Sequence, residues 1–254
     1  MHSYTGLIII FATFCTFLTW DYFHVKPVQT FFNWNDKNRL IDFTGLLAQG
    51  LFVPILQVVL VVWALDIMFP FAHASIPMNP VLMFMLNFIV VDYAYYWNHR
   101  LLHSKALWNW HLVHHTAKRM DVWVTSRNTF WSPLFIIYLW LNGFFIFILK
   151  DPAPFILSAS ITAALDIWRH SELSPKKGTL LNLLISSCFI TPHEHGWHHS
   201  TNKSNCNFGA NLNWWDKLHN TYYSPETNPP LLGIELQMNI WKRLFYPFSR
   251  ELQQ

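Results

Sequence analysis

Long apolar runs alternate with shorter polar stretches along the whole chain. A helix that crosses the hydrocarbon core of a bilayer needs about 20 predominantly apolar residues, and five runs approach that length. We predict membrane helices at residues 4–20, 48–69, 81–97, 132–149 and 154–168. A sixth apolar run, 179–190, is short and interrupted by polar residues, which favours a segment that lies at the membrane surface or is half inserted.

Proline-rich turns separate the runs in pairs. Three prolines lie between Pro70 and Pro80, and two lie in the stretch from Lys150 to Pro154. Proline stops helices and marks turns, so the second and third runs form one helical hairpin, and the fourth and fifth form another. The pattern predicts an all-α protein, an integral membrane helical bundle.

Charge gives the bundle an orientation. Of the 17 Lys and Arg residues, only Lys150 lies outside the ranges 21–47, 98–131 and 169–254, which the hairpins place on one side of the membrane. Basic residues are concentrated on the cytoplasmic side of membrane proteins. We therefore expect that side to be cytoplasmic.

Composition supports the membrane prediction and excludes other classes. Charged residues make up 12% of the chain, about half of what soluble domains carry. The net charge of +3 and the absence of a basic run argue against nucleic acid as a partner. The three cysteines are widely spaced and predict neither a disulfide framework nor a CxxC metal site. The first apolar run lacks the basic start and the cleavage site of a signal peptide, so we expect it to be retained.

Histidines supply the candidate chemistry. Ten of the 14 histidines lie between His99 and His199, and eight of these form one HxxxH and two HxxHH patterns, with His170 between the two triplets. Residues three and four apart share one face of a helix, so each pattern can direct several imidazoles at one point. Neutral imidazole is a ligand for iron, copper, zinc and nickel. We expect nine histidines to bind metal: His99, His103, His111, His114, His115, His170, His195, His198 and His199.

The number of histidines favours two metal ions over one. A hydrolytic zinc site uses three protein ligands and a water, and the HExxH motif of metalloproteases does not occur here. An all-imidazole pair of redox metals with open positions for dioxygen fits better. The predicted topology places all nine ligands beside the membrane on the cytoplasmic side, in a histidine-rich helical cap.

Other residues near the clusters have supporting roles in this interpretation. His193 is a possible additional ligand or a gate. Metal-bound histidines usually donate their second N–H to a carboxylate or carbonyl, and we expect that role for Asp92, Glu194 and Asp166.

Several motifs, in this order and spacing, resemble the fatty acid hydroxylase superfamily, which includes sterol desaturases. The resemblance covers about residues 92–222, half of the chain. The matching motifs are Asp92-x-x-x-Tyr96-Trp97-x-His99-Arg100-x-x-His103, Trp108-x-x-His111-x-x-His114-His115, Arg169-His170-Ser171, Thr191-Pro192-x-x-His195-x-x-His198-His199-Ser200, Asn207-Phe208-Gly209 and Trp215-Asp216-Lys217-Leu218. The family often has a histidine two residues after the equivalent of Arg127, where this chain has Thr129.

The resemblance implies an oxygen-dependent oxidation of a lipid C–H bond. It implies two iron ions as cofactors, for which zinc can substitute in purified protein. It also implies a fatty acyl, sterol-like or related membrane lipid as substrate, dioxygen as oxidant, and a separate electron donor of the ferredoxin or cytochrome b5 type with its reductase. Hydroxylation is our prediction. A desaturase that uses the same site, and a non-catalytic metal-binding membrane protein such as a transporter, remain alternatives, as does a membrane zinc hydrolase.

We expect three regions along the chain. Residues 1–47 hold the first membrane helix and a cytoplasmic loop, residues 48–222 hold the hairpins and the catalytic part, and residues 223–254 form a tail with an amphipathic segment near Ile240–Phe248. We expect a multi-pass protein of the bacterial inner membrane, or of the endoplasmic reticulum membrane in a eukaryote.

Overall fold

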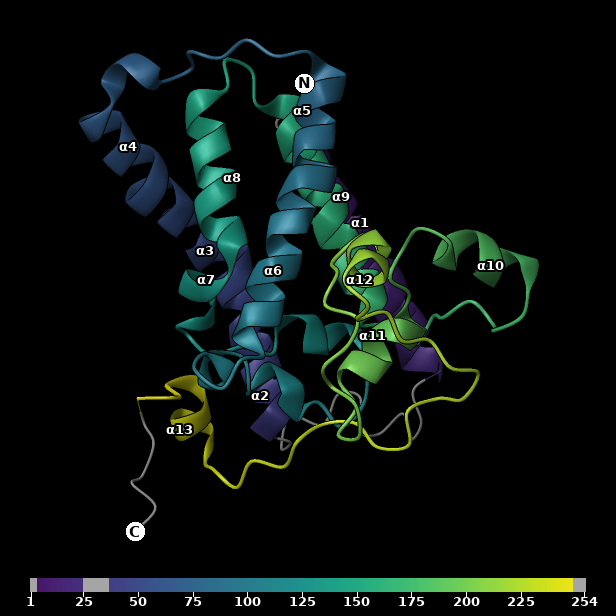
Figure 1. Cartoon of the computed structure of the whole chain (residues 1–254). Coiled ribbons are helices and arrows are strands. Elements are labelled where there is room, and N and C mark those ends of the chain that lie inside the picture. The colour runs from purple at the N-terminus through teal and green to yellow at the C-terminus, as the bar shows by residue number, and fades with distance from the viewer. Residues whose placement is uncertain (1–3, 25–36, 249–254) are drawn as a thin grey trace.

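The structure is a computed structural model that describes residues 4–24 and 37–248 (Figure 1). Within these ranges the regular structure is helical, and the only β-type pairing is in isolated bridges. The predicted all-α fold is confirmed. Three helices are long and apolar enough to cross a membrane: Thr5–His24, Asn38–Met68 and Pro80–Leu102.

The first helix, α1 (Thr5–His24), packs along α9 (Ala153–Arg169). A small residue, Gly6, allows the close approach, since a Cβ there would lie 2.3 Å from Oγ of Ser160. On α1, the side chains of Leu7, Ile8 and Phe11 are exposed, as a lipid-facing surface requires, whereas Phe14 and Leu18 pack against a core cluster. The prediction of a helix over 4–20 is correct, and the helix continues for four residues beyond it.

The second helix begins well before the predicted residue 48. It runs through α2 (Lys37–Leu47), α3 (Val53–Leu56) and α4 (Trp63–Met68), with π-helical turns between these parts. Pro54 has no N–H to donate to the preceding turn, and a π-helical turn directly precedes α3. Its first part, α2, is not uniformly apolar, which is why the hydrophobic pattern placed the start of the helix too late.

The third helix consists of α5 (Pro80–Met85), a π-helical turn, and α6 (Asp92–Leu102). Asn79 caps its beginning by accepting a hydrogen bond from the backbone of Val81, and Pro80 occupies the first helical position. The helix extends past the predicted end at residue 97, and this extension carries His99.

The second hairpin is shorter than predicted. The run 132–149 is divided by extended backbone at Ile136 into α7 (Ser132–Phe135) and α8 (Ile137–Ile148). At 1.5 Å per residue, the 12 residues of α8 span about 18 Å, against about 30 Å for the hydrocarbon core. By length, the prediction of a membrane-spanning helix is therefore not met by α8, and the 17-residue α9 approaches it.

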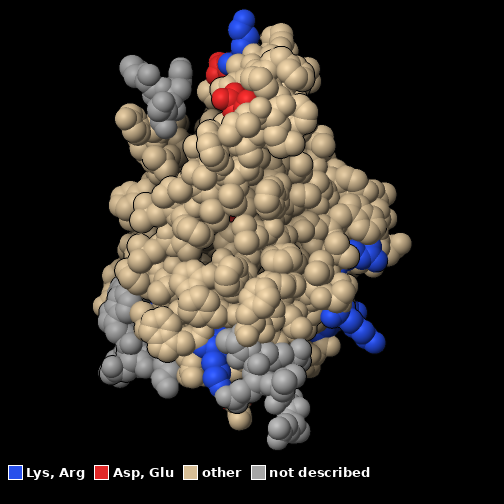
Figure 2. Space-filling model, turned by 90° about the vertical axis from the view of Figure 1, so that its left-hand side faces the viewer, with Lys and Arg blue, Asp and Glu red and all other residues tan. Residues whose placement is uncertain are grey.

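Most of the remaining elements lie in the middle and lower part of the molecule in Figure 1, with α10 at its right edge. They are the 3₁₀ turns Trp108–Trp110, His114–Thr116 and Val122–Ser126 and the short helices α10 (Leu180–Ser186), α11 (Pro192–His198), α12 (Trp214–Leu218) and α13 (Ile240–Leu244). Figure 2 shows charged side chains near the two ends of one face and a broad band of uncharged surface between them. That band is the surface expected to face lipid.

Buried ion pairs hold the lower part of the molecule together. Arg127 binds the carboxylate of Asp42 on α2 through two hydrogen bonds of 2.6 and 2.7 Å. Arg39, also on α2, binds Asp121. Asp21 on α1 accepts hydrogen bonds from the backbone N–H groups of Val122 and Glu172. These contacts fix the segment 121–127 against the first two helices.

Some predicted surface features have a mixed outcome. Most of the leucines of α10 are exposed, as a segment at the membrane surface requires. In the C-terminal segment, Trp241 and Phe248 are exposed, whereas Leu244 packs in a core cluster with Ile41 of α2. The tail therefore combines an exposed apolar face with ordinary packing against the bundle.

Candidate metal centre

The HxxxH pair comes from the end of α6. His99 lies in the last turn of the helix, and His103 is its C-cap residue. Nδ1 of His99 lies 2.9 Å from the backbone carbonyl oxygen of Phe208. A carbonyl only accepts hydrogen bonds, so Nδ1 carries the proton. Nε2 of the neutral ring then keeps a lone pair, which it can offer to a metal.

The first HxxHH triplet is not on an α-helix. His111 follows one 3₁₀ turn, and His114 and His115 lie in the next. The α-helical expectation is wrong at this point, yet the tight turns still bring the three rings together, with centroids 4.9 to 5.6 Å apart. Nδ1 of His114 lies 3.3 Å from the carbonyl oxygen of Arg127.

The second triplet is helical, as its spacing predicts. It lies on α11, where Pro192 takes the first position and Thr191 and Glu194 form a capping box. His195 and His198 are in the last turn, and His199 is the C-cap. Nδ1 of His198 donates to the carbonyl oxygen of Cys206 over 2.8 Å.

His170 joins the second triplet from the end of α9. It is the C-cap of the helix, and its Nδ1 donates to the carbonyl oxygen of Asp166 over 2.8 Å. Its Nε2 lies 3.0 Å from Nε2 of His195 and 3.4 Å from Nε2 of His114. The isolated histidine thus lies between the two triplets.

The nine histidines divide into two groups, and in each group the candidate ligand atoms lie within 4.8 Å of one another. The first group has five members: His99, His103, His111, His115 and His198. The second has four: His114, His170, His195 and His199. Each HxxHH triplet contributes to both groups, which therefore share their supporting elements.

The donor atoms of the second group fit a metal ion. The protons on Nδ1 of His114 and His170 are fixed by carbonyl acceptors, so both Nε2 atoms present lone pairs, and these face each other at 3.4 Å. Two facing lone pairs repel unless a cation lies between them.

Ring nitrogens without a hydrogen-bond partner also fit metal binding, and they occur in both histidine groups. Buried Nε2 atoms without a hydrogen-bond partner among the described residues belong to His103, His115, His198 and His199. An unpaired buried polar atom is costly, and metal coordination would satisfy each of these.

Burial also keeps the rings neutral, which metal binding requires. Desolvation lowers the pKa of His103 to about 2 and that of His198 to about 4, and neighbouring histidines oppose the charged form as well. The same causes hold the pKa values of further cluster members well below the ordinary value of histidine: His111, His114, His115, His195 and His199. The clusters can therefore receive a metal without first losing protons at neutral pH.

The three predicted supporting carboxylates contact the site in different ways. The backbone carbonyl of Asp166 accepts a hydrogen bond from Nδ1 of His170, and the carboxylate of Asp166 lies 3.5 Å from the same nitrogen. The carboxylate of Asp92 accepts hydrogen bonds from the backbone of Asn211 and Leu212 and from the indole of Trp215. It therefore holds a neighbouring loop, and its described partners do not include a histidine.

Glu194 and His193 also lie beside the clusters. Burial alone would raise the pKa of Glu194, but hydrogen bonds from Ser224 and Thr191 and the charge of Lys177 lower it overall. Its contacts cap α11 and tie that helix to the tail. Nε2 of His193 lies 2.9 Å from the carbonyl oxygen of Pro225, and His193 belongs to neither histidine group.

Sequence reasoning missed the residue that orders the loop after the second triplet. Asp216 is fully buried, and its carboxylate accepts hydrogen bonds from the backbone N–H groups of Phe208 and Gly209 and from the hydroxyl of Thr221. This loop supplies the carbonyl groups that hold His99 and His198. The Trp215-Asp216-Lys217-Leu218 motif is the available signal, although by itself it is equally compatible with a salt bridge or a turn at Asp216.

A short segment of the tail closes the site from outside. The N–H of Gly233 donates to the carbonyl of His199 over 3.2 Å, and that of Ile234 donates to the carbonyl of His115 over 2.7 Å. Gly233 has a φ of 75° and a Cβ there would lie 2.4 Å from the carbonyl oxygen of Ala117. Only glycine fits this close approach.

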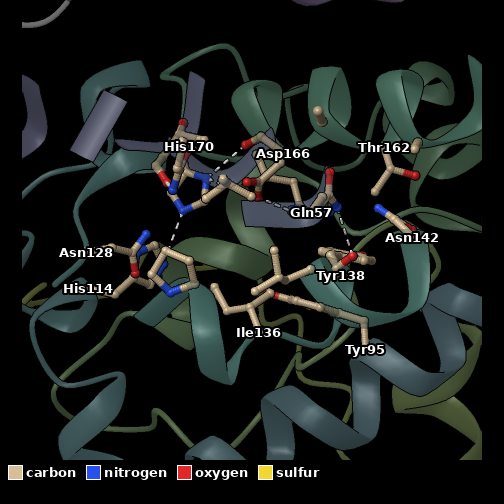
Figure 3. Close-up of a pocket in the computed structure, with 18 of the residues that line it drawn as sticks. Gln57, Tyr95, His114, Asn128, Ile136, Tyr138, Asn142, Thr162, Asp166 and His170 are labelled. Carbon is tan, nitrogen blue, oxygen red and sulfur yellow. Dashed lines mark hydrogen bonds and ion pairs between the residues drawn. The ribbon is translucent and has the colours of Figure 1, made fainter. Parts of the chain in front are cut away.

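A cavity of about 280 Å³ leads from the histidines into the helical bundle (Figure 3). His111, His114, His170 and His195 line one part of it. The walls come from α3, α6, α8, α9 and the π-helical turn that follows α2, and they include apolar side chains together with polar ones such as Asn142. The two histidine groups thus open toward the part of the molecule that the bilayer surrounds.

Comparisons with known proteins agree with this geometry. The family model described as fatty acid hydroxylase matches residues 84–221, more than half of the chain. Ornithine lipid hydroxylase OlsE of Rhizobium tropici is 32% identical over 174 residues, 65% of this chain and 50% of the relative. Alkylglycerol monooxygenase of Xenopus tropicalis is 28% identical over 172 residues, 66% of this chain and 35% of the relative. No solved structure matches the chain.

The chain spans half or less of the length of these curated relatives. The matched range 84–221 contains all nine clustered histidines and the residues whose backbone carbonyls hold three of them, Arg127, Cys206 and Phe208. The resemblance inferred from the motifs is confirmed, and the chain belongs to the fatty acid hydroxylase family.

Proposed function

We propose that this chain is a membrane-bound, non-haem di-iron oxygenase that hydroxylates a C–H bond of a lipid. The observation that carries the proposal is the pair of buried histidine groups that open onto a cavity inside the membrane bundle. Overall, the lipid and dioxygen, with two electrons and two protons, give an alcohol and water. When bound, the metal pair supplies the activation of dioxygen that an unreactive C–H bond requires.

The five-histidine group and the four-histidine group would each hold one iron ion, with zinc as a substitute in purified protein. Backbone carbonyls hold Nδ1 of His99, His114 and His198 and thereby direct Nε2 inward. Because the rings are buried, bulk water is kept away from the reacting bond. His114 and His170 belong to the second histidine group and also line the cavity. A lipid in the cavity therefore lies beside the proposed metal centre.

The substrate and the setting follow from the same features. The names of the two relatives, ornithine lipid hydroxylase and alkylglycerol monooxygenase, support a membrane lipid as substrate. We propose that residues 48–222 form the catalytic part, that the histidines face the cytoplasm of a bacterium, and that a separate ferredoxin or cytochrome b5 type protein delivers the electrons.

Lipid mass spectrometry under labelled dioxygen tests the proposal. Cells that express the wild type should contain a lipid with one labelled oxygen, which cells with the His198→Ala variant lack. His73→Ala is the matched control, because His73 is half-exposed, pairs with Asp66 and belongs to neither histidine group. Cells with the control variant should still contain the labelled lipid. The purified control protein should also retain its iron, which elemental analysis measures.

Two outcomes contradict hydroxylation. A lipid that loses two hydrogens without gaining label indicates a desaturase with the same site. Full activity in the His198→Ala variant would show that the histidine groups do not carry the reaction.

A further inference from the structure

A buried arginine with two unused donors lies in the wall of the cavity. Arg169, the last residue of α9, is 3% exposed, and its Nη2 donates to the carboxylate of Asp166 over 2.5 Å. Its Nε and Nη1 have no hydrogen-bond partner among the described residues. Donors of a buried charged group that stay unpaired are costly, and a bound group that accepts hydrogen bonds from them would offset that cost.

A tyrosine hydroxyl in the same wall is also unpaired. Oη of Tyr138 is buried and has no hydrogen-bond partner in the described part of the chain. The ring is held in place by stacking on Tyr95, with centroids 4.6 Å apart and planes 7° apart. Gln57 donates to the backbone carbonyl of Tyr138, which fixes the residue further (Figure 3). The hydroxyl is therefore rigidly placed, and Tyr138 and Tyr95 are electrostatic neighbours of Arg169.

These donors line the same cavity as the histidine groups. Arg169 and Tyr138 line it together with His114 and His170. Arg169 is directly followed in the chain by His170, a member of the second histidine group. A lipid group that accepts hydrogen bonds from these donors therefore lies beside the histidines, and only a few bonds separate it from the carbon nearest to them.

The charge of the cavity wall indicates which chemical group of a lipid would bind there. Asp166 offsets the charge of Arg169 through their ion pair, and the unpaired atoms of Arg169 and Tyr138 are N–H and O–H donors. An uncharged acceptor with two lone pairs matches them. The carbonyl oxygen of an ester or amide has this chemistry, whereas a plain hydrocarbon chain would leave the donors unpaired.

We propose that Arg169 and Tyr138 bind the carbonyl oxygen of an ester or amide in the lipid substrate and thereby position a carbon close to that carbonyl for oxidation. This inference deepens the proposed function and rests on it for the reaction, but the binding step is separate from catalysis. It assigns a specificity role to two residues outside the histidine groups.

The test measures binding without turnover. Purified full-length protein in detergent is titrated under nitrogen, without reductant, with methyl hexadecanoate and with nonadecane, a hydrocarbon of the same number of non-hydrogen atoms. The wild type should bind the ester more tightly than the hydrocarbon. Tyr138→Phe should weaken ester binding roughly fivefold and Arg169→Lys roughly tenfold or more, with hydrocarbon binding unchanged.

The Tyr138→Phe variant separates a loss of ester binding from misfolding. Its hydroxyl has no described partner to lose, so the thermal unfolding temperature and the iron content should stay at the wild-type values. Tyr4→Phe is the matched control, since Tyr4 is 71% exposed and removal of its hydroxyl should leave ester binding unchanged.

The inference is overturned if the wild type binds the ester no more tightly than the hydrocarbon, or if both variants keep the full ester preference. Oxygen incorporation does not enter this assay. A protein that prefers the ester but never incorporates labelled oxygen would refute the proposed function and leave the carbonyl site standing, and the reverse result would refute only the carbonyl site.

Discussion

At the scale of single residues, Asp216 acts on the histidines through one backbone group. Its carboxylate holds the N–H groups of Phe208 and Gly209, and the carbonyl of Phe208 holds His99. We predict that Asp216→Ala loses iron and destabilises the protein, because each buried N–H that loses its acceptor costs about 1–3 kcal/mol. Elemental analysis and thermal unfolding of the purified variant measure both effects.

The exposed Asp151 provides the control for that prediction. Its carboxylate accepts a hydrogen bond from the backbone N–H of Ala153 at the start of α9, far from the histidines, so Asp151→Ala should keep its iron. Normal iron content in Asp216→Ala would show that the loop keeps its shape without the carboxylate, and that His99 does not depend on it.

Residue identities indicated which histidines lie together, but not which groups hold them in place. Spacing identified eight of the nine histidines that the structure brings into two groups, and the ninth, His170, belongs to none of the spaced patterns. Three supporting contacts come from backbone carbonyls of Phe208, Arg127 and Cys206. Any residue has a carbonyl, so its position in the fold, and not its identity in the sequence, determines this role.

At the scale of elements, Gly45 sets the contact between α2 and the turn that precedes Arg127. A Cβ at Gly45 would lie 1.7 Å from the backbone oxygen of Ser126. We predict that Gly45→Ala lowers the free energy of unfolding by about 1–3 kcal/mol, the cost of overpacking a core, and weakens iron binding by shifting the carbonyl that holds His114. Denaturation of detergent-solubilised protein measures the first effect and elemental analysis the second.

Gly50, on the same long helix, is the matched control. A Cβ there meets nothing within 4 Å, so Gly50→Ala should raise the free energy of unfolding by about 0.5–1 kcal/mol through the higher helix propensity of alanine. Equal stability of the two variants would contradict the close packing of α2 on this turn.

Hydrophobic periodicity predicted where helices lie but not how each one ends. The apolar pattern located α1, the long second helix and the helix that carries His99. It could not predict that the first triplet lies in 3₁₀ turns, because i, i+3 and i+4 spacing brings side chains together in both kinds of helix. The division at Ile136 likewise depends on tertiary packing, since no proline or glycine marks it.

At the scale of the whole molecule, the distribution of basic residues predicts the orientation in the membrane. Lys150 lies in the turn between α8 and α9, and Lys105 follows α6 at the other end. We predict that a membrane-impermeant maleimide labels Lys150→Cys in intact cells and does not label Lys105→Cys until the cells are opened. Both substitutions are made after the three native cysteines are replaced by alanine. The opposite pattern would place the histidines outside the cytoplasm.

The contacts of Gly233 and Ile234 with His199 and His115 have a consequence for biosynthesis. All nine histidines leave the ribosome before this covering segment, which follows the last of them by about thirty residues. At a synthesis rate of roughly 5–20 residues per second, the clusters stay uncovered for a few seconds. The nascent chain thus has an interval in which a metal ion could reach the histidines before Gly233 and Ile234 bond to His199 and His115.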